Sequence, residues 1–291
     1  MGNDNKKTTY AQFIMAMVIV GTIGIFRRNI ALSSAALAFS RGILGSLSLG
    51  AFVKVRGQKI FHGMERKKLF LLILNGAIIG VNWIFLFEAY RFTTVAVATL
   101  CYYLQPTILI LVSPIFFKEK LTGKKLFYAL IAFLGMVLVS GVLGGGDTGS
   151  LKGVAFGLAA AVLYTMAVVI NKITLGVDPY EKTIIQLASA GIVLIPYILM
   201  TEDISAVQLD TITIILVLIV GIIHTGLVYF FYFGSMEHMS AQAVAVFSYI
   251  DPVVAVIASW AFLGEPLTVP VIIGAVLIIG SAFLSERTNN E

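Results

Sequence analysis

Residues 103–121 read YLQPTILILVSPIFFKEKL, and residues 249–267 read YIDPVVAVIASWAFLGEPL. The two segments align without a gap at an offset of 146 residues, and further identities precede them. These place Gly80, Phe85 and Phe87 on Gly226, Phe231 and Phe233. Shared hydrophobic composition produces some matches by itself, but Tyr, Pro and Glu are not abundant here and they match in register. The sequence therefore predicts two copies of one structural unit.

The composition is that of a membrane protein. Of the 291 residues, 59% are hydrophobic and only 12% are charged, and the mean hydropathy is +0.97. Soluble domains carry about 25% charged residues, so this chain has too little polar surface to cover a water-soluble globule. A soluble enzyme and a disordered chain are excluded. Because Cys101 is the single cysteine, a disulfide scaffold is excluded as well.

Ten apolar runs are long enough to cross a bilayer, because about 20 helical residues span its hydrocarbon core. They are Tyr10–Phe26, Ser33–Val53, Leu69–Tyr90, Thr94–Phe117, Leu126–Leu143, Leu151–Lys172, Lys182–Met200, Thr211–Phe233, Ala241–Leu263 and Leu267–Leu284. The first run is expected to be a retained helix rather than a cleaved signal peptide. Arg27 and Arg28 follow it, and no small-residue cleavage site precedes them.

The basic residues predict the orientation. With the N-terminus inside, most of the 20 Lys and Arg residues fall on the inner side. Both termini are then cytoplasmic, in a multi-pass protein of the cell (inner or cytoplasmic) membrane. Arg27 and Arg28 are the exception at an outer end, where they either gate or attract anions or extend to lipid headgroups. Nucleic acid is not an expected partner, because the basic residues form short clusters between apolar runs rather than one solvated face.

The repeat divides the chain into residues 10–146 and 150–286, each with five predicted spans. Because five is odd, the second copy enters the membrane from the opposite side. The predicted fold is an all-α membrane protein with ten transmembrane helices, arranged as two inverted five-helix repeats around a central cavity. Secondary transporters often have this architecture, with the substrate site near the midplane. The Gly-rich residues 144–149 lack the Lys–Ser/Thr of a phosphate-binding loop, so they are predicted to be a linker.

The repeated motifs, Tyr103–Pro106 with Phe116–Leu121 and Tyr249–Pro252 with Phe262–Leu267, resemble the drug/metabolite transporter superfamily, in particular its ten-helix EamA-type branch. The resemblance covers about residues 10 to 286, and Arg41 resembles an early arginine of that branch. It implies a transporter that needs no cofactor, and it favours efflux and a functional monomer. It does not select a substrate, because the branch carries amino acids, nucleotide-related metabolites, quaternary amines and drugs.

Asp251, in the middle of the ninth predicted span, is the leading candidate for a binding residue. A charge at the bilayer centre is costly, so such residues usually face the protein interior and mark a pathway. The equivalent residue in the first copy is Gln105, a neutral amide before Pro106. Asp251 either binds a cation, an amine or a proton, or is a protonated or hydrogen-bonded packing residue.

Three further polar residues in the predicted spans have two interpretations each. Arg41 either holds a substrate carboxylate or forms a structural pair with Asp251 or Glu88. Glu88 either belongs to a gate or proton path or forms an exposed ion pair with Arg91, three residues away. His224 either relays protons or hydrogen-bonds between packed helices.

Aromatic and amide side chains complete the predicted site. Each alone is more often a packing residue, but around an acid they suit an amine through cation–π contacts or an aromatic ring through stacking. The candidates are Trp83, Tyr90, Tyr103, Tyr164, Tyr229, Tyr249 and Asn82, and Tyr102, Tyr232 and Gln186 lie at similar depth. Glu119 and Glu265, at equivalent span ends, are expected instead to cap the start of the following helix.

The predicted function is secondary-active or facilitative transport of small metabolites by alternating access, with amino acids or related amines as the leading substrates. Proton coupling and facilitated exchange stay open, and Asp251, His224 and Glu88 are the coupling candidates. Quaternary amines, cationic drugs and nucleotide-related metabolites are alternative substrates. A membrane enzyme is disfavoured, because His62, His224 and His238 are scattered and form no metal cluster. A scaffold or sensor has no need of an acid at the midplane.

Overall fold

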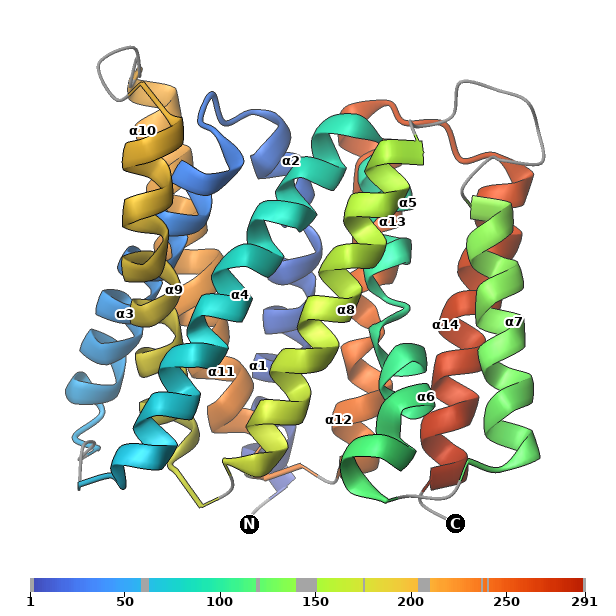
Figure 1. The fold of residues 1–291 in the computed structure, drawn as a ribbon, viewed down its shortest axis with the longest axis horizontal. Coiled ribbons are helices and arrows are strands. Elements are labelled where there is room, and N and C mark those ends of the chain that lie inside the picture. The colour runs from blue at the N-terminus through green and yellow to red at the C-terminus, as the bar shows by residue number, and fades with distance from the viewer. Residues whose placement is uncertain are drawn as a thin grey trace.

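Helices make up nearly all of the chain that the structure describes (Figure 1). The structure is a computed structural model, and it describes residues 3–58, 63–118, 121–139, 151–174, 176–203, 210–236, 238–239 and 241–289. Within these ranges it contains no β-strand. The expected all-α fold is therefore confirmed.

The helices of the first half are α1 (Asn3–Gly21), α2 (Ile23–Arg28), α3 (Ser34–Val55), α4 (Arg66–Phe92), α5 (Val95–Tyr102), α6 (Gln105–Phe117) and α7 (Gly123–Val139). Those of the second half are α8 (Leu151–Ile173), α9 (Pro179–Thr201), α10 (Thr211–Leu218), the π-helix η3 (Ile219–Leu227), α11 (Val228–Met236), α12 (Ala241–Ser248), α13 (Ile250–Leu263) and α14 (Val269–Asn289).

Each predicted span falls on one helix or on consecutive helical segments. Within the described ranges, seven segments are long and apolar enough to cross a membrane, and the helices Ile250–Leu263 and Val269–Leu284 are apolar but shorter. The chain is thus a multi-pass membrane protein. Part of what was predicted lies outside the described residues, namely Glu119, His62, residues 140–143 of the fifth span and the glycine-rich residues 144–149.

The fourth and ninth spans break at the two tyrosines that the repeat aligns. Tyr103 separates α5 from α6 with φ −74° and ψ 5°, and Tyr249 separates α12 from α13 with φ −74° and ψ −5°. Pro106 and Pro252 lie in the first turn of the new helices. A proline costs no hydrogen bond there, because the first N–H groups of a helix have no acceptor within it. Both spans are therefore two helices rather than one bent helix.

These two spans also end alike. α6 is followed by Lys118 with φ 56°, and α13 by Gly264 with φ 66°, at the same offset of 146 residues. Both residues are in the left-handed conformation that commonly closes a helix and that L-residues other than glycine rarely adopt. The two halves thus share their local geometry from the helix break to the C-cap.

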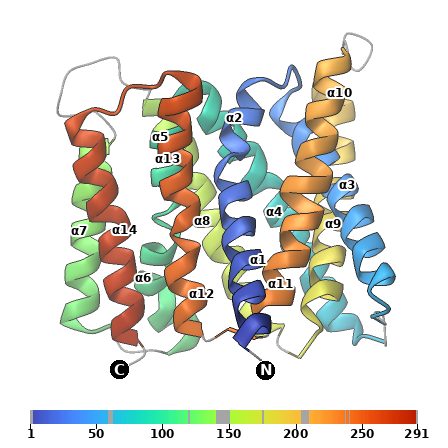
Figure 2. The ribbon, with the colours of Figure 1, turned by 180° about the vertical axis from the view of Figure 1, so that it is seen from behind.

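Two helix pairs in the tertiary packing join helices that the repeat relates, namely α3 with α9 and α7 with α14. Two further pairs, α4 with α8 and α1 with α11, are counterparts of each other under the same offset. Figure 1 shows that α1 runs away from the end of the bundle where both termini lie, whereas α8 runs towards it. Figure 2 shows the α7–α14 pair at one side of the bundle and α3, α9 and α10 at the other. We call the end away from the termini the distal end.

Two further spans, the first and the eighth, were expected to be continuous helices and are irregular. Thr22 interrupts the first span between α1 and α2. The eighth span changes to π-helix over Ile219–Leu227, where the Thr225 hydroxyl donates to the Val220 carbonyl at 2.9 Å. π-Helical turns within α-helices are often found at functional sites.

Several helix starts follow ordinary capping chemistry. The Ser33 hydroxyl accepts the Ala36 N–H at 3.0 Å before α3, and the Thr94 hydroxyl accepts the Val97 N–H at 3.1 Å before α5. Each side chain satisfies a backbone donor that the helix leaves unpaired. These caps fix where the chain turns at the distal end.

Candidate functional site

The Tyr103 hydroxyl donates a hydrogen bond to the Asp251 carboxylate, which joins the two halves of the chain at their helix breaks. Tyr103 comes from the end of α5, and Asp251 lies in the first turn of α13. The N-terminal end of a helix carries a partial positive charge, so this position stabilises a carboxylate. Asp251 remains half-buried.

Arg41 of α3 is held from two sides. Its guanidinium lies 4.1 Å from the centre of the Trp83 ring, and its Nε donates to the Thr225 hydroxyl at 3.0 Å. Arg41 is only 7% exposed. Among the described residues it forms no ion pair with Asp251 or Glu88, so the expected structural pair is not found. The Arg41 guanidinium is stabilised instead by a cation–π contact with Trp83 and a hydrogen bond to Thr225.

A third set of contacts brings tyrosines from both halves together. The rings of Tyr102 and Tyr164 stack with centres 5.3 Å apart. The Tyr102 ring also meets the Tyr103 ring edge-on with centres 6.2 Å apart, and Tyr102 and Tyr229 pack against the buried hydrophobic cluster that contains Trp83. We call the connected set of Arg41, Trp83, Tyr102, Tyr103, Tyr164, Tyr229 and Asp251 the central cluster.

Tyr102 belongs to the central cluster although it was not among the leading candidates. Its neighbour Tyr103 drew attention through the repeat, whereas Tyr102 has Ser248 as its equivalent and so carries no repeat signal. Tyr164 is 39% exposed, and Tyr102, Tyr103 and Tyr229 are half-buried. These rings therefore keep free surface for contact with a small molecule.

Other predicted site residues make different contacts. The Asn82 side chain donates to the Ala160 carbonyl at 2.5 Å and joins α4 to α8. The Tyr249 ring packs edge-on against Phe283 of α14. Gln105 is buried, and its backbone carbonyl accepts a hydrogen bond from the Thr165 hydroxyl at 3.3 Å. The symmetry of the sequence is thus not repeated in the side-chain contacts.

His224 lies in the π-helix and faces the break between α1 and α2. Its Nε2 lies 3.0 Å from the Thr22 hydroxyl, and its ring contacts Phe26 with centres 4.4 Å apart. It is buried and next in sequence to Thr225, which holds Arg41. A hydrogen-bonded packing role accounts for these contacts.

Glu88 lies at the distal end, where it accepts hydrogen bonds from Arg91 at 2.9 Å and from Ser34 at 2.6 Å. This is the ion pair expected from the three-residue spacing. Arg27 does not extend to the surface, since it is only 5% exposed and donates to the Ile30 carbonyl at 3.1 Å. The interpretation that it reaches lipid headgroups is therefore wrong.

Glu265 caps a helix of the other half rather than the following helix, α14. Its carboxylate accepts the Val95 N–H at 2.8 Å and 3.0 Å, at the start of α5. It also pairs with Arg28 at 3.2 Å, and Arg28 donates to the Thr93 carbonyl at 2.6 Å. The α13–α14 connection is thus tied to α2 and to the α4–α5 connection.

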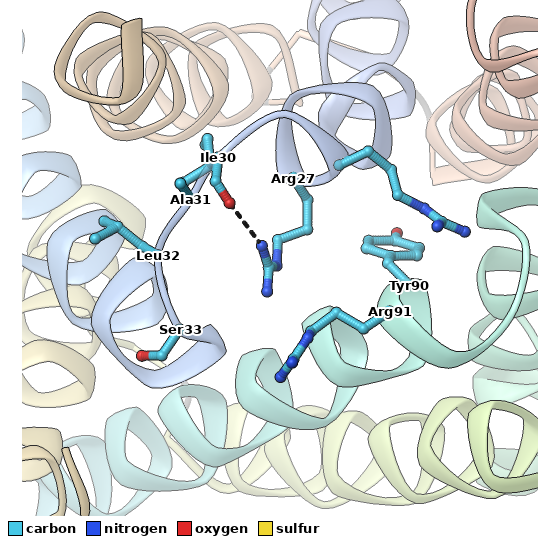
Figure 3. Close-up of a pocket in the computed structure, with 8 residues that line it drawn as sticks. Arg27, Ile30, Ala31, Leu32, Ser33, Tyr90 and Arg91 are labelled. Atoms are coloured by element: carbon cyan, nitrogen blue, oxygen red, sulfur yellow. Dashed lines mark hydrogen bonds between the residues drawn. The ribbon is translucent and has the colours of Figure 1, made fainter. Parts of the chain in front are cut away.

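A cavity of about 490 Å³ opens at the distal end between α2, the following loop and the end of α4. Figure 3 shows Arg27, Tyr90 and Arg91 facing this space, with the loop residues Ile30–Ser33 along its other side. The Tyr90 hydroxyl lies 3.3 Å from the Thr99 hydroxyl, and the Tyr90 ring belongs to the same buried hydrophobic cluster as Trp83. Tyr90 is therefore shared by this cavity and the surroundings of the central cluster.

Comparison with known proteins identifies the kind of molecule. The sequence model of the EamA-like transporter family matches residues 7–141 of this chain and, a second time, residues 151–287. The chain is 29% identical over 287 residues to the uncharacterized transporter YxxF of Bacillus subtilis (strain 168), which covers 98% of this chain and 91% of that protein. It is 27% identical over 225 residues to the protein PecM of Dickeya dadantii (strain 3937), covering 74% and 73% of the two chains.

A solved crystal structure has the same fold. Its TM-score to this chain is 0.67 at 18% sequence identity, and the match covers 97% of this chain and 99% of the other. The family match includes both halves and nearly every described helix. This chain is a membrane transporter and belongs to the EamA-like transporter family.

Proposed function

We propose that this protein moves amino acids or related amines across the membrane by alternating access, in the direction of efflux, and that the central cluster binds the substrate. The carrying observation is that Asp251 of one half and the buried Arg41 of the other border one connected set of aromatic side chains without forming an ion pair with each other. An α-amino acid has one ammonium and one carboxylate. Asp251 suits the first group, and Arg41 suits the second.

The aromatic residues support the same substrate class. Trp83 lies against Arg41, Tyr102 packs against the buried cluster that contains Trp83, and Tyr164 stacks on Tyr102. Such faces contact an ammonium through cation–π interaction and an apolar side chain through burial. Half-helices whose ends meet at a substrate site are a recurrent feature of transporters. The break at Tyr249, with Asp251 in the following turn, is consistent with this arrangement.

The duplicated architecture supports the alternating-access cycle. The helix breaks and the left-handed caps coincide under the offset of 146 residues, and α1 and α8 run in opposite directions. If the two halves form an inverted repeat, exchange of their conformations converts an inward-facing site into an outward-facing one. Our proposal includes cytoplasmic termini, location in the cytoplasmic (inner) membrane and a functional monomer.

Flux into proteoliposomes tests the proposal. Proteoliposomes that contain the purified protein are loaded with one member of a panel of unlabelled amino acids, choline, nucleosides and sugar phosphates. Exchange against external labelled amino acids is then measured between pH 5.5 and 8. We expect exchange with amino acids or their decarboxylated amines. The variant Asp251→Asn should abolish exchange or its pH dependence, while Asp203→Asn, the same change at an exposed position, should retain both.

The pH profile separates the two modes of transport. In a proton-coupled cycle an imposed pH gradient drives accumulation, and in a facilitative cycle it does not. Wild-type rates and pH dependence in a folded Asp251→Asn variant contradict the assignment of the site. Exchange confined to sugar phosphates or nucleosides contradicts the substrate class.

A further inference from the structure

Among the described residues that line the distal cavity there is no carboxylate, although Glu88, Glu202 and Glu265 hydrogen-bond to lining residues at its edge. Arg27, Arg28 and Arg91 all line it. Arg91 pairs with Glu88 at 2.9 Å, and Arg28 pairs with Glu265 at 3.2 Å. Arg27 has no direct ion pair among the described residues: it donates to the Ile30 carbonyl at 3.1 Å and to the Ser34 hydroxyl at 3.2 Å, and that hydroxyl in turn donates to Glu88 at 2.6 Å.

Arg27 is also incompletely satisfied. It is 5% exposed, and its buried Nε has no hydrogen-bond partner among the described residues. A buried charge without a direct counter-ion is unfavourable, and so is a buried N–H without an acceptor. An oxyanion in the cavity relieves both deficits, since guanidinium groups bind carboxylate and phosphate oxygens with charge-assisted hydrogen bonds.

The lining also indicates what else such a ligand carries. Ile30, Ala31 and Leu32 contribute an apolar side to the cavity, and Tyr90 contributes an aromatic ring (Figure 3). The volume of about 490 Å³ is within the usual range for small-molecule pockets. A carboxylate or phosphate joined to a small apolar group therefore matches the cavity better than a bare inorganic ion.

We propose that the distal cavity is an oxyanion-binding site, separate from the central cluster, in which Arg27 is the principal ligand and Arg28 and Arg91 assist. The oxyanion comes either from a dissolved metabolite or from a lipid headgroup. Tyr90 lines this cavity and belongs to the same buried hydrophobic cluster as Trp83, so a dissolved metabolite held here lies on the other side of that cluster from Arg41. The binding itself does not depend on the proposed transport function.

Thermal unfolding in lipid nanodiscs tests this assignment. Protein in phosphatidylcholine discs is titrated with millimolar inorganic phosphate, and separately with hexanoate, at constant ionic strength. We expect both probes to raise the Tm of the wild type saturably. In Arg27→Gln the concentration of hexanoate or phosphate that gives half of the maximal Tm increase should be at least tenfold higher. The control is Lys152→Gln, which removes an exposed positive charge at the start of α8 outside the cavity and should behave as the wild type.

Arg91→Gln is the second variant, because Arg91 is half-exposed and its loss is less disruptive to folding. It should weaken the response and decides the matter if Arg27→Gln does not fold. The titration is repeated in discs that contain phosphatidylglycerol. A response that anionic lipid removes assigns the site to a headgroup, and a response that persists assigns it to a dissolved anion. No saturable response in the wild type, or an equal response in all variants, overturns the proposal.

Discussion

The hydroxyl of Tyr103 donates a hydrogen bond to the carboxylate of Asp251, although 148 positions separate the two residues in the sequence. The residue that the repeat makes equivalent to Asp251 is Gln105, and the residue equivalent to Tyr103 is Tyr249, whose ring lies against Phe283. Two nearly identical backbone breaks thus carry different side-chain contacts. At this aligned position the second half has an acid and the first half has a neutral amide.

Tyr103→Phe should impair transport without unfolding the protein. The ring is retained, but the Asp251 carboxylate loses a donor, and a hydrogen bond to a charged group is worth about 1.5–3 kcal/mol. We expect the ratio kcat/KM for the transported amine or amino acid to fall about tenfold or more in proteoliposomes, since 1.4 kcal/mol corresponds to a factor of ten. Tyr197→Phe removes a hydroxyl from a ring that is 49% exposed, and it should leave transport unchanged. Equal rates in the two variants contradict a role for Tyr103.

Glu265 should stabilise the protein through a helix start in the other half. Glu265→Ala removes the acceptor of the Val95 N–H and the partner of Arg28, whereas Glu265→Gln keeps an oxygen acceptor. We expect the Tm to decrease in the order wild type, Gln, Ala, with an unfolding penalty of about 0.5–2 kcal/mol for Ala, as for lost N-caps. Glu65→Ala is the matched control, because Glu65 precedes α4 without a capping hydrogen bond from its side chain. A Glu65→Ala effect as large as that of Glu265→Ala contradicts the contact.

The sequence was sufficient to predict the all-helical fold and the approximate positions of the spans, because long apolar runs indicate helices that cross a bilayer. The role of Asp251 as a binding residue stays a prediction. The sequence was not sufficient to predict partners. Glu265 was expected to cap α14, but its carboxylate lies at α5, since helix-dipole arguments find a nearby helix start and not one brought close by tertiary packing. Asn82 has the depth of a site residue and yet faces Ala160 of α8.

The irregular helices could not be predicted from the sequence either. No proline marks the change to π-helix at Ile219, and Gly221 and Gly226 within it also suit close packing of straight helices; the deviation places Thr225 against Arg41. The burial of Arg27 was not predicted either, because the side chain of an arginine at the end of a span ordinarily extends to the membrane–water interface. In each case the deciding interaction joins residues from distant parts of the sequence, which hydropathy and spacing do not encode.

Asp210 should make stability depend on pH at one helix start. Hydrogen bonds from the side chain and the backbone N–H of Thr213 lower the pKa of Asp210, which caps α10 with an N···O distance of 2.8 Å. A lowered folded-state pKa contributes stability above the unfolded value, which is about 3.9, and that contribution is lost as the pH falls through the folded value. The Tm difference between wild type and Asp210→Ala should be constant above pH 5 and shrink below pH 4. Asp210→Asn should keep a pH-independent cap, and a difference that grows in acid contradicts this account.

Gly42 should be intolerant of a methyl group, because α3 and α9 cross there. A Cβ at Gly42 would lie 2.7 Å from both the Gly191 nitrogen and the Leu187 oxygen, which are backbone atoms. Gly42→Ala therefore forces the helices apart, at a cost of about 1–3 kcal/mol for overpacking. Gly50→Ala in the same helix meets no atom within 4 Å and should instead stabilise by about 0.5–1 kcal/mol through helix propensity. Tm values that change in the same direction contradict the crossing.

Lys118 and Gly264 allow the repeat to be tested at a single backbone angle. Both have a left-handed φ, at 56° and 66°, and a Cβ at Gly264 meets no atom within 4 Å. Any effect of substitution there therefore reports the backbone angle rather than a steric clash. An L-residue pays roughly 1–2 kcal/mol for this conformation, so Gly264→Ala should lower the Tm. Lys118→Gly should raise it, because glycine adopts the angle without strain. Lys118→Ala, which removes the charge and keeps the strain, should not raise the Tm, and an increase as large as that of Lys118→Gly would assign the gain to charge instead of backbone geometry.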